Sequence, residues 1–201
     1  MSLKNTADHY GTVARWLHWS IAILFLGAYC AVYYRHWFTE PKTTANTIAL
    51  QLHLSCGLSA AALVVVRIVW RFMNQQPRLE PGGRVAHLAA HWGHFALYFI
   101  MIAAPLTGYL GTGANTKFFF LLDVPNVQST TAFQTFVVER GGLTFDEFEE
   151  PIDVVHKAIL GKWIVWLLVV GHALAALYHH FVKRDRTLVK MTGGRTRNAL
   201  S

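Results

Sequence analysis

Four long apolar stretches, joined by two short polar connections and one long one, dominate the pattern of this chain. They cover about residues 16–34, 48–72, 88–110 and 154–181, and each is predominantly apolar. Roughly 20 helical residues cross a hydrocarbon core of ~30 Å, so each stretch is long enough for one spanning helix. With their flanks included, the stretches predict spans over about 14–36, 47–72, 86–110 and 153–182.

The long connection, residues 111–152, combines apolar and acidic segments. Residues 118–122 and 133–138 are apolar, and we expect them to lie on the membrane surface as a lid over the outer end of the bundle. The acidic run from Asp146 to Asp153 reads as a solvated loop face. The predicted fold class is therefore an all-α membrane protein, a single four-transmembrane-helix domain over residues 1–201.

Composition supports the membrane class, and charge gives a predicted orientation. The chain is 53% hydrophobic and only 14% charged, with a mean hydropathy of +0.31, which excludes an ordinary soluble domain. The net charge of +7 gathers on one side of the four spans, which predicts cytoplasmic N and C termini and contact with anionic lipid, not nucleic acid. The basic residues on this side include Lys4, Arg15, Arg67, Arg71, Arg78, Arg84, Lys183, Arg184, Arg186, Lys190, Arg195 and Arg197.

The chain has eleven histidines, and in so apolar a chain they are the main candidates for a functional site. An ionisable residue at bilayer depth is a functional-site hypothesis by default, and imidazole is the commonest metal ligand. Sorted by depth, His36, His53 and His156 stand near the outer side, and His18, His94 and His172 near the inner side. Two imidazoles from different helices at one depth suit axial ligation of a b-type haem, so two depths predict two haems. There is no Cys-x-x-Cys-His motif, so the haems would be held non-covalently.

Two further pairs of residues each have two alternative roles. Arg67 and Arg71 either snorkel to the inner headgroups or pair with a haem propionate, since guanidinium matches carboxylate geometry. His87 and His91, at the start of the third span, either bond water and headgroups or carry protons, because imidazole titrates near neutral pH.

The ordered motifs resemble those of the bacterial cytochrome b561 family. They are Arg15–Trp19 (RWLHW) in the first span, His53–Gly57 (HLSCG) in the second, the histidine-rich start of the third, and Gly171–Phe181 (GHALAALYHHF) in the fourth. The resemblance covers nearly the whole chain outside the long loop. It implies a multi-pass protein of the bacterial inner membrane, with His18 and His172 as ligands of an inner haem and His53 and His156 of an outer one.

The spacing of the two ligands on the fourth span demands a special backbone. His156 and His172 are sixteen residues apart, and at ~100° per residue a straight α-helix would turn their side chains about 160° away from each other. A π-bulge, or a break near Gly161, would restore a common face. Without either, His36 is the substitute outer ligand.

The resemblance also implies electron exchange with ubiquinone, and some members resemble superoxide oxidases. The expected enzyme is thus an oxidoreductase that takes electrons from superoxide, an anion that outer cations such as Arg35 would attract. Protons for quinone reduction would come from the cytoplasm through His179, His180, His87 or His91. Two alternatives remain: a di-haem relay subunit that serves a redox partner protein, as in hydrogenase or formate dehydrogenase, and a non-redox protein with incidental histidines.

Overall fold

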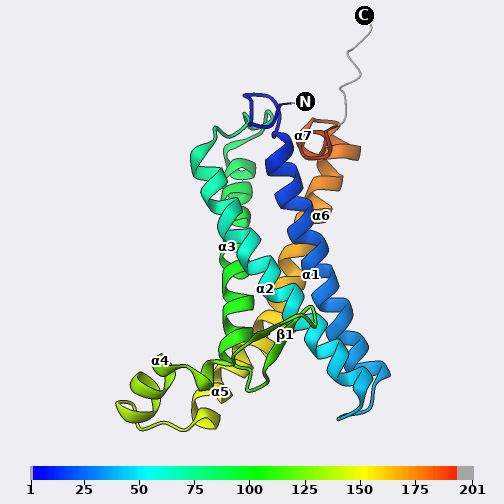
Figure 1. Ribbon diagram of the computed structural model, residues 1–201. Coiled ribbons are helices and arrows are strands. Elements are labelled where there is room, and N and C mark those ends of the chain that lie inside the picture. The colour runs from blue at the N-terminus through cyan, green and yellow to red at the C-terminus, as the bar shows by residue number, and fades with distance from the viewer. Residues whose placement is uncertain (1, 194–201) are drawn as a thin grey trace, which may run out of the picture.

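Four long helices form the molecule, which is described here by a computed structural model covering residues 2–193 (Figure 1). The first three are α1 (Thr12–Phe38), α2 (Thr44–Met73) and α3 (Arg84–Leu110). The fourth runs from Phe145 to Lys183 and consists of α5 (Phe145–Asp153), the π-helix η3 (Val154–Ile164), α6 (Val165–Tyr178) and the π-helix η4 (His179–Lys183). All four are long and apolar enough to cross a membrane, which confirms the predicted fold class.

The two ends of the described chain meet at one end of the bundle, which we call the terminal end (Figure 1). There the Asn5 side chain donates to the Gln75 carbonyl at 2.9 Å, and Lys190 of the short helix α7 (Thr187–Thr192) donates to the Arg78 carbonyl at 2.6 Å. We call the opposite end the distal end. The predicted cytoplasmic residues belong to the terminal end, except that Arg195 and Arg197 lie outside the described residues.

The long distal connection is partly structured. It contains an antiparallel hairpin of β1 (Thr116–Phe118) and β2 (Leu122–Val124), then the 3-10 turn η1 (Val127–Ser129), α4 (Thr131–Phe133) and the π-turn η2 (Gln134–Glu139). The hairpin lies beside α2, whereas α4 projects away from the bundle beside the distal end of α3 (Figure 1). The two apolar segments therefore do not form the common lid that the sequence suggested.

The acidic run is helical and does not form the expected solvated loop. Thr144 caps α5, because its hydroxyl accepts from the Glu147 backbone N–H while the Glu147 carboxylate accepts from the Thr144 backbone N–H. This capping box and the acidic residues of the first turn stabilise a helix start, so the fourth helix begins eight residues before the predicted position 153.

Packing and exposure are distributed as in a membrane bundle. Small side chains such as Ala49, Ser55 and Ala60 are buried on α2, where they allow close approach of neighbouring segments. Large apolar side chains, among them Phe72 and Leu167, are exposed on the outside of the helices. Lipid is the natural cover for such a surface.

Candidate functional site

Two pairs of imidazoles face each other across the bundle at two depths. Towards the distal end, His53 of α2 and His156 of η3 have ring centroids 6.2 Å apart, with ring planes at 72°. Towards the terminal end, His18 of α1 and His172 of α6 have centroids 6.1 Å apart, with planes at 62°. In each pair one imidazole comes from the first two helices and the other from the fourth.

Hydrogen bonds orient both imidazoles of the distal pair. The His53 Nδ1–H donates to the Ala28 carbonyl of α1 at 2.9 Å. Thr107 of α3 donates its hydroxyl proton to the Ala103 carbonyl at 2.7 Å, so its oxygen accepts from the His156 Nδ1–H, 3.2 Å away. These tautomers are assigned from the hydrogen-bond network, and they leave the Nε2 lone pair of each ring free to bind a metal.

The π-helix η3 puts His156 and His172 on one face of the fourth helix. In a π-helix each residue bonds five positions back, so each residue turns the chain by less than the ~100° of an α-helix. Eight of the sixteen steps from His156 to His172 lie in η3, so the total rotation falls below the ~1,600° of a straight α-helix and moves towards about 1,440°, which is four full turns. The change of helical register that the sixteen-residue spacing required is therefore present, and His156, not the exposed His36, faces His53.

Glycines and a tyrosine fit closely around this π segment. A Cβ on Gly161 would lie 2.8 Å from the carbonyl oxygen of His156, five residues back. Tyr29 of α1 donates its hydroxyl to the Gly161 carbonyl at 2.9 Å. On α3, a Cβ on Gly108 would lie 2.9 Å from Cε1 of His156. The π segment is thus contacted by α1 at the Gly161 carbonyl and by α3 at the His156 ring.

A third imidazole joins the terminal pair. His94 of α3 lies 5.7 Å from His172, measured between ring centroids, and its Nδ1–H donates to the Ala90 carbonyl at 2.7 Å. Within residues 2–193, however, no three His, Cys, Asp or Glu side chains converge to hold one metal ion. The facing pair, rather than a cluster, is the arrangement that suits a metal group at this end.

The two predicted arginines share one aromatic partner near the terminal end. The guanidinium carbons of Arg67 and Arg71 lie 5.9 and 5.6 Å from the ring centroid of Tyr98. The Arg67 Nε–H also donates to the Tyr98 hydroxyl at 3.3 Å, and its NH1 group to the Ala14 carbonyl at 3.4 Å. Arg67 therefore stands within one helical turn of His18 and bonds to side-chain and backbone groups of α3 and α1.

The predicted proton and anion groups lie apart from the facing pairs. The Nδ1–H of His179 donates to the Asp185 carboxylate, and the Nε2–H of His87 donates to the Glu80 carbonyl at 3.1 Å. Both are at the terminal end. At the distal end, the Arg35 Nε–H donates to the Asn46 side-chain oxygen at 3.1 Å, and Arg35 lines an open surface depression with His36.

Electrostatics at the terminal end follow from the same contacts. Burial would raise the pKa of the Asp185 carboxyl, but hydrogen bonds from His179 and Thr187 outweigh it and hold the pKa below its ordinary value. The Asp185 carboxylate therefore stays ionised beside His179 at neutral pH.

The sequence argument missed the groups that position the histidines. These are Ala28, Tyr29, Tyr98 and Thr107, which contact the candidate residues from other helices. Tyr29 and Thr107 gave no signal of their own, because their partners lie 132 and 49 positions away in the chain.

Comparison with known proteins identifies relatives along nearly the whole chain. The family model for prokaryotic cytochrome b561 matches residues 9–194. Cytochrome b561 homolog 2 of Escherichia coli K12 is 30% identical over 207 residues, covering 96% of each chain. Cytochrome b561 homolog 1 of the same organism is 27% identical, covering 88% of this chain and 92% of the relative. A probable superoxide oxidase, CybB, of Yersinia pestis is 25% identical, covering 87% and 90%.

Proposed function

The chain belongs to the prokaryotic cytochrome b561 family of b-type haem membrane electron-transfer proteins, and from that premise we propose that it passes electrons through two haems to ubiquinone, with superoxide as the donor. The observation that carries the proposal is the presence of two facing imidazole pairs at two depths. The proposed ligands are His18 with His172 and His53 with His156.

The spacing of both pairs fits a bis-imidazole haem. Two metal–nitrogen bonds of about 2 Å, plus about 1.1 Å from each nitrogen to its ring centroid, give roughly 6.2 Å between centroids. The measured separations are 6.1 and 6.2 Å. The free Nε2 atoms of the distal pair support the same assignment.

The surrounding side chains of this chain have separate roles in the proposal. Arg67 and Arg71 would hold the propionate carboxylates of a bound haem, for which a guanidinium supplies two parallel donors. Thr107 and the Ala28 carbonyl fix the imidazole orientations and raise the basicity of the ligands. When bound, each b haem supplies a one-electron couple whose potential these contacts tune.

The two pairs lie far enough apart to serve the two halves of the membrane. Fourteen residues of α2 separate His53 of the distal pair from Arg67, which lies beside the terminal pair. Fourteen helical residues span about 21 Å along the helix axis. This is most of a hydrocarbon core of ~30 Å. One pair therefore belongs to each leaflet, as transmembrane electron transfer requires.

Donor and acceptor complete a balanced reaction. Two superoxide anions each lose one electron and become dioxygen, while ubiquinone gains both electrons and two protons and becomes ubiquinol. Arg35 supplies positive charge at the distal end for the anion. His179 and His87 supply protons at the terminal end: the carboxylate of Asp185 orients the His179 imidazole and leaves its Nε2 free to pass a proton. The relative named as a probable superoxide oxidase supports the choice of donor.

Haem stoichiometry is the first test of this function. The purified protein should contain two haems per chain in a pyridine haemochrome assay and show two one-electron waves in a potentiometric titration. His53→Ala and His172→Ala should each lose a different wave. One haem per chain, or loss of the same wave in both variants, contradicts the assignment.

Pulse-generated superoxide tests the donor and the acceptor. The oxidised protein in nanodiscs should become reduced after the pulse, and added ubiquinone should accelerate turnover. Arg35→Gln should slow the superoxide step and leave the haem spectrum unchanged. A di-haem protein that does not react with superoxide would instead be a relay subunit for a partner protein.

A further inference from the structure

The β1–β2 hairpin has a tip that an aqueous loop would not be expected to carry. Strand partners are Lys117 with Asp123 and Phe118 with Leu122, and the turn residues Phe119 and Phe120 have φ values of +45° and +64°. Two consecutive left-handed residues in a hairpin turn usually include Asn or Gly, because a Cβ is unfavourable in that conformation. The chain uses two phenylalanines at this position, so apolar character takes precedence over conformational preference.

Two buried polar side chains of α2 fasten the hairpin to that helix. Gln51 accepts from the Lys117 backbone N–H at 2.6 Å and donates to the Asn115 carbonyl at 3.0 Å. Ser55, which is fully buried, accepts from the Phe119 backbone N–H at 2.9 Å. The contacts run from Gln51 to Ser55, so the hairpin follows α2 away from the distal end. Its tip lies closer than its base to the mid-length of α2.

The helix length gives the depth of these contacts. α2 has 30 residues and is about 45 Å long, roughly 15 Å more than a hydrocarbon core of ~30 Å. With α2 centred in the bilayer, about 7 Å of helix projects at each end. Gln51 then lies about 3 Å inside the hydrocarbon boundary and Ser55 about 9 Å inside it.

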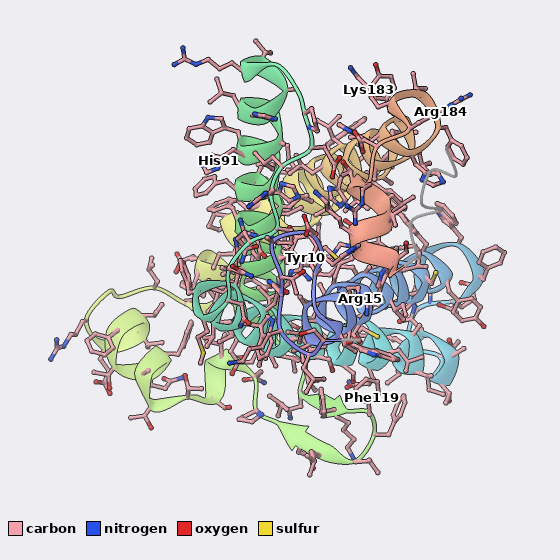
Figure 2. The ribbon with its side chains drawn as sticks, turned by 90° about the horizontal axis from the view of Figure 1, so that it is seen from above. Tyr10, Arg15, His91, Phe119, Lys183 and Arg184 are labelled. Carbon is pink, nitrogen blue, oxygen red and sulfur yellow. The ribbon has the colours of Figure 1, made fainter. Side chains whose placement is uncertain are left out.

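The polarity of the hairpin matches this depth. The charged residues Lys117 and Asp123 oppose each other at the level of Gln51, near the boundary. Beyond them the tip is wholly apolar, and Leu121 and Leu122 are 85% and 66% exposed. The labelled Phe119 lies on the side of α2 away from α3, outside the bundle (Figure 2).

Backbone hydrogen bonds satisfy the turn and the edge of the hairpin that faces α2. Non-helical backbone at membrane depth needs partners for its polar groups, because lipid chains offer none. Besides the strand pairing, Gln51 and Ser55 satisfy three groups that face α2. In the turn, the Phe120 and Leu121 N–H groups donate to the Lys117 and Phe118 carbonyls, each at 3.0 Å.

We infer that the β1–β2 hairpin is a re-entrant element whose tip inserts among the acyl chains of the distal leaflet, beside α2. This binding surface for lipid rests on the membrane location of the bundle and not on its redox role. The surface consists of Phe119, Phe120, Leu121 and Leu122.

Site-directed spin labelling tests the insertion in the haem-loaded protein. Cys30 and Cys56 are replaced by alanine, and a single cysteine is introduced as Leu121→Cys, with Glu139→Cys as the control on the exposed turn η2. Both variants are labelled in phosphatidylcholine–phosphatidylglycerol nanodiscs. Power saturation then compares collisions with dioxygen, which partitions into lipid, and with a water-soluble nickel chelate.

The label at position 121 should collide several-fold more with dioxygen than with the nickel chelate, and the label at 139 should show the reverse. A nickel-favoured label at 121 would place the tip in water and overturn the inference. A label shielded from both reagents would mean that protein, such as a second copy of the chain, covers the tip, which also overturns it. Leu122→Cys repeats the measurement if Leu121→Cys fails to bind haem.

Discussion

Replacing Gly161 with alanine should disrupt the distal imidazole pair. In an ordinary helix this change stabilises by up to about 1 kcal/mol, because alanine has the higher helix propensity. Here the new Cβ would lie 2.8 Å from the carbonyl oxygen of His156, well inside van der Waals contact. Overpacking of this kind costs about 1–3 kcal/mol, so the net effect changes sign.

The expected structural response is a return of η3 to the α-helical register. Each of the eight steps between His156 and Ile164 would then turn by the ~100° of an α-helix, which is more than a π-helical step turns. The His156 imidazole would rotate by about 160° relative to His172 and leave its position opposite His53. We therefore expect Gly161→Ala to lose the distal haem and keep the terminal one.

Haem content and redox titration measure this outcome. Gly161→Ala should fall from two haems to one per chain and show a single one-electron wave. Gly171→Ala is the matched control, because it lies on the α-helical part of the same span and its Cβ would meet nothing within 4 Å. Two haems with unchanged potentials in Gly161→Ala would refute the role assigned to the π register.

Three further variants probe the contacts around the pairs. Thr107→Val removes the acceptor for the His156 Nδ1–H, so the affinity for the distal haem should weaken about 10–100-fold. Competition with a haem scavenger measures this affinity, and unchanged retention of the distal haem would contradict the role of Thr107. Arg67→Gln removes a positive charge that favours the reduced state, so one potentiometric wave should shift to lower potential, whereas no shift argues against propionate binding. Asp185 has a lowered pKa, so its stabilising contact with His179 should be complete at neutral pH and be lost only as the pH falls below about 4. Asp185→Asn should remove that acid-dependent part of the thermal unfolding profile in detergent, and a profile identical to that of the parent would contradict the assignment.

The sequence was sufficient for the fold class and for the grouping of histidines by depth. Continuous apolar runs reveal spans because length and hydropathy are local properties of the chain. Depth follows from the same count, since position along a helix is proportional to residue number. Depth alone therefore places His53, His156 and His36 near one side, and the structure brings the first two face to face.

Other features depend on contacts that no local pattern encodes. The spacing of His156 and His172 called for a π-bulge or a break, but it could not choose between them. The choice depends on Gly161, which fits against a carbonyl and receives the Tyr29 hydroxyl from another helix. The early start of the fourth helix was likewise missed, because acidic residues suit a loop as well as the first turn of a capped helix.

The origin of the two facing pairs determines when each pair can form during membrane insertion. Each pair combines an imidazole from α1 or α2 with one from the fourth helix, which is translated last. A nascent chain that has inserted only α1, α2 and α3 thus presents half of each pair. On the proposed ligand assignment, both haem sites would close together when the final span enters the membrane, so haem loading would follow the insertion of the complete bundle.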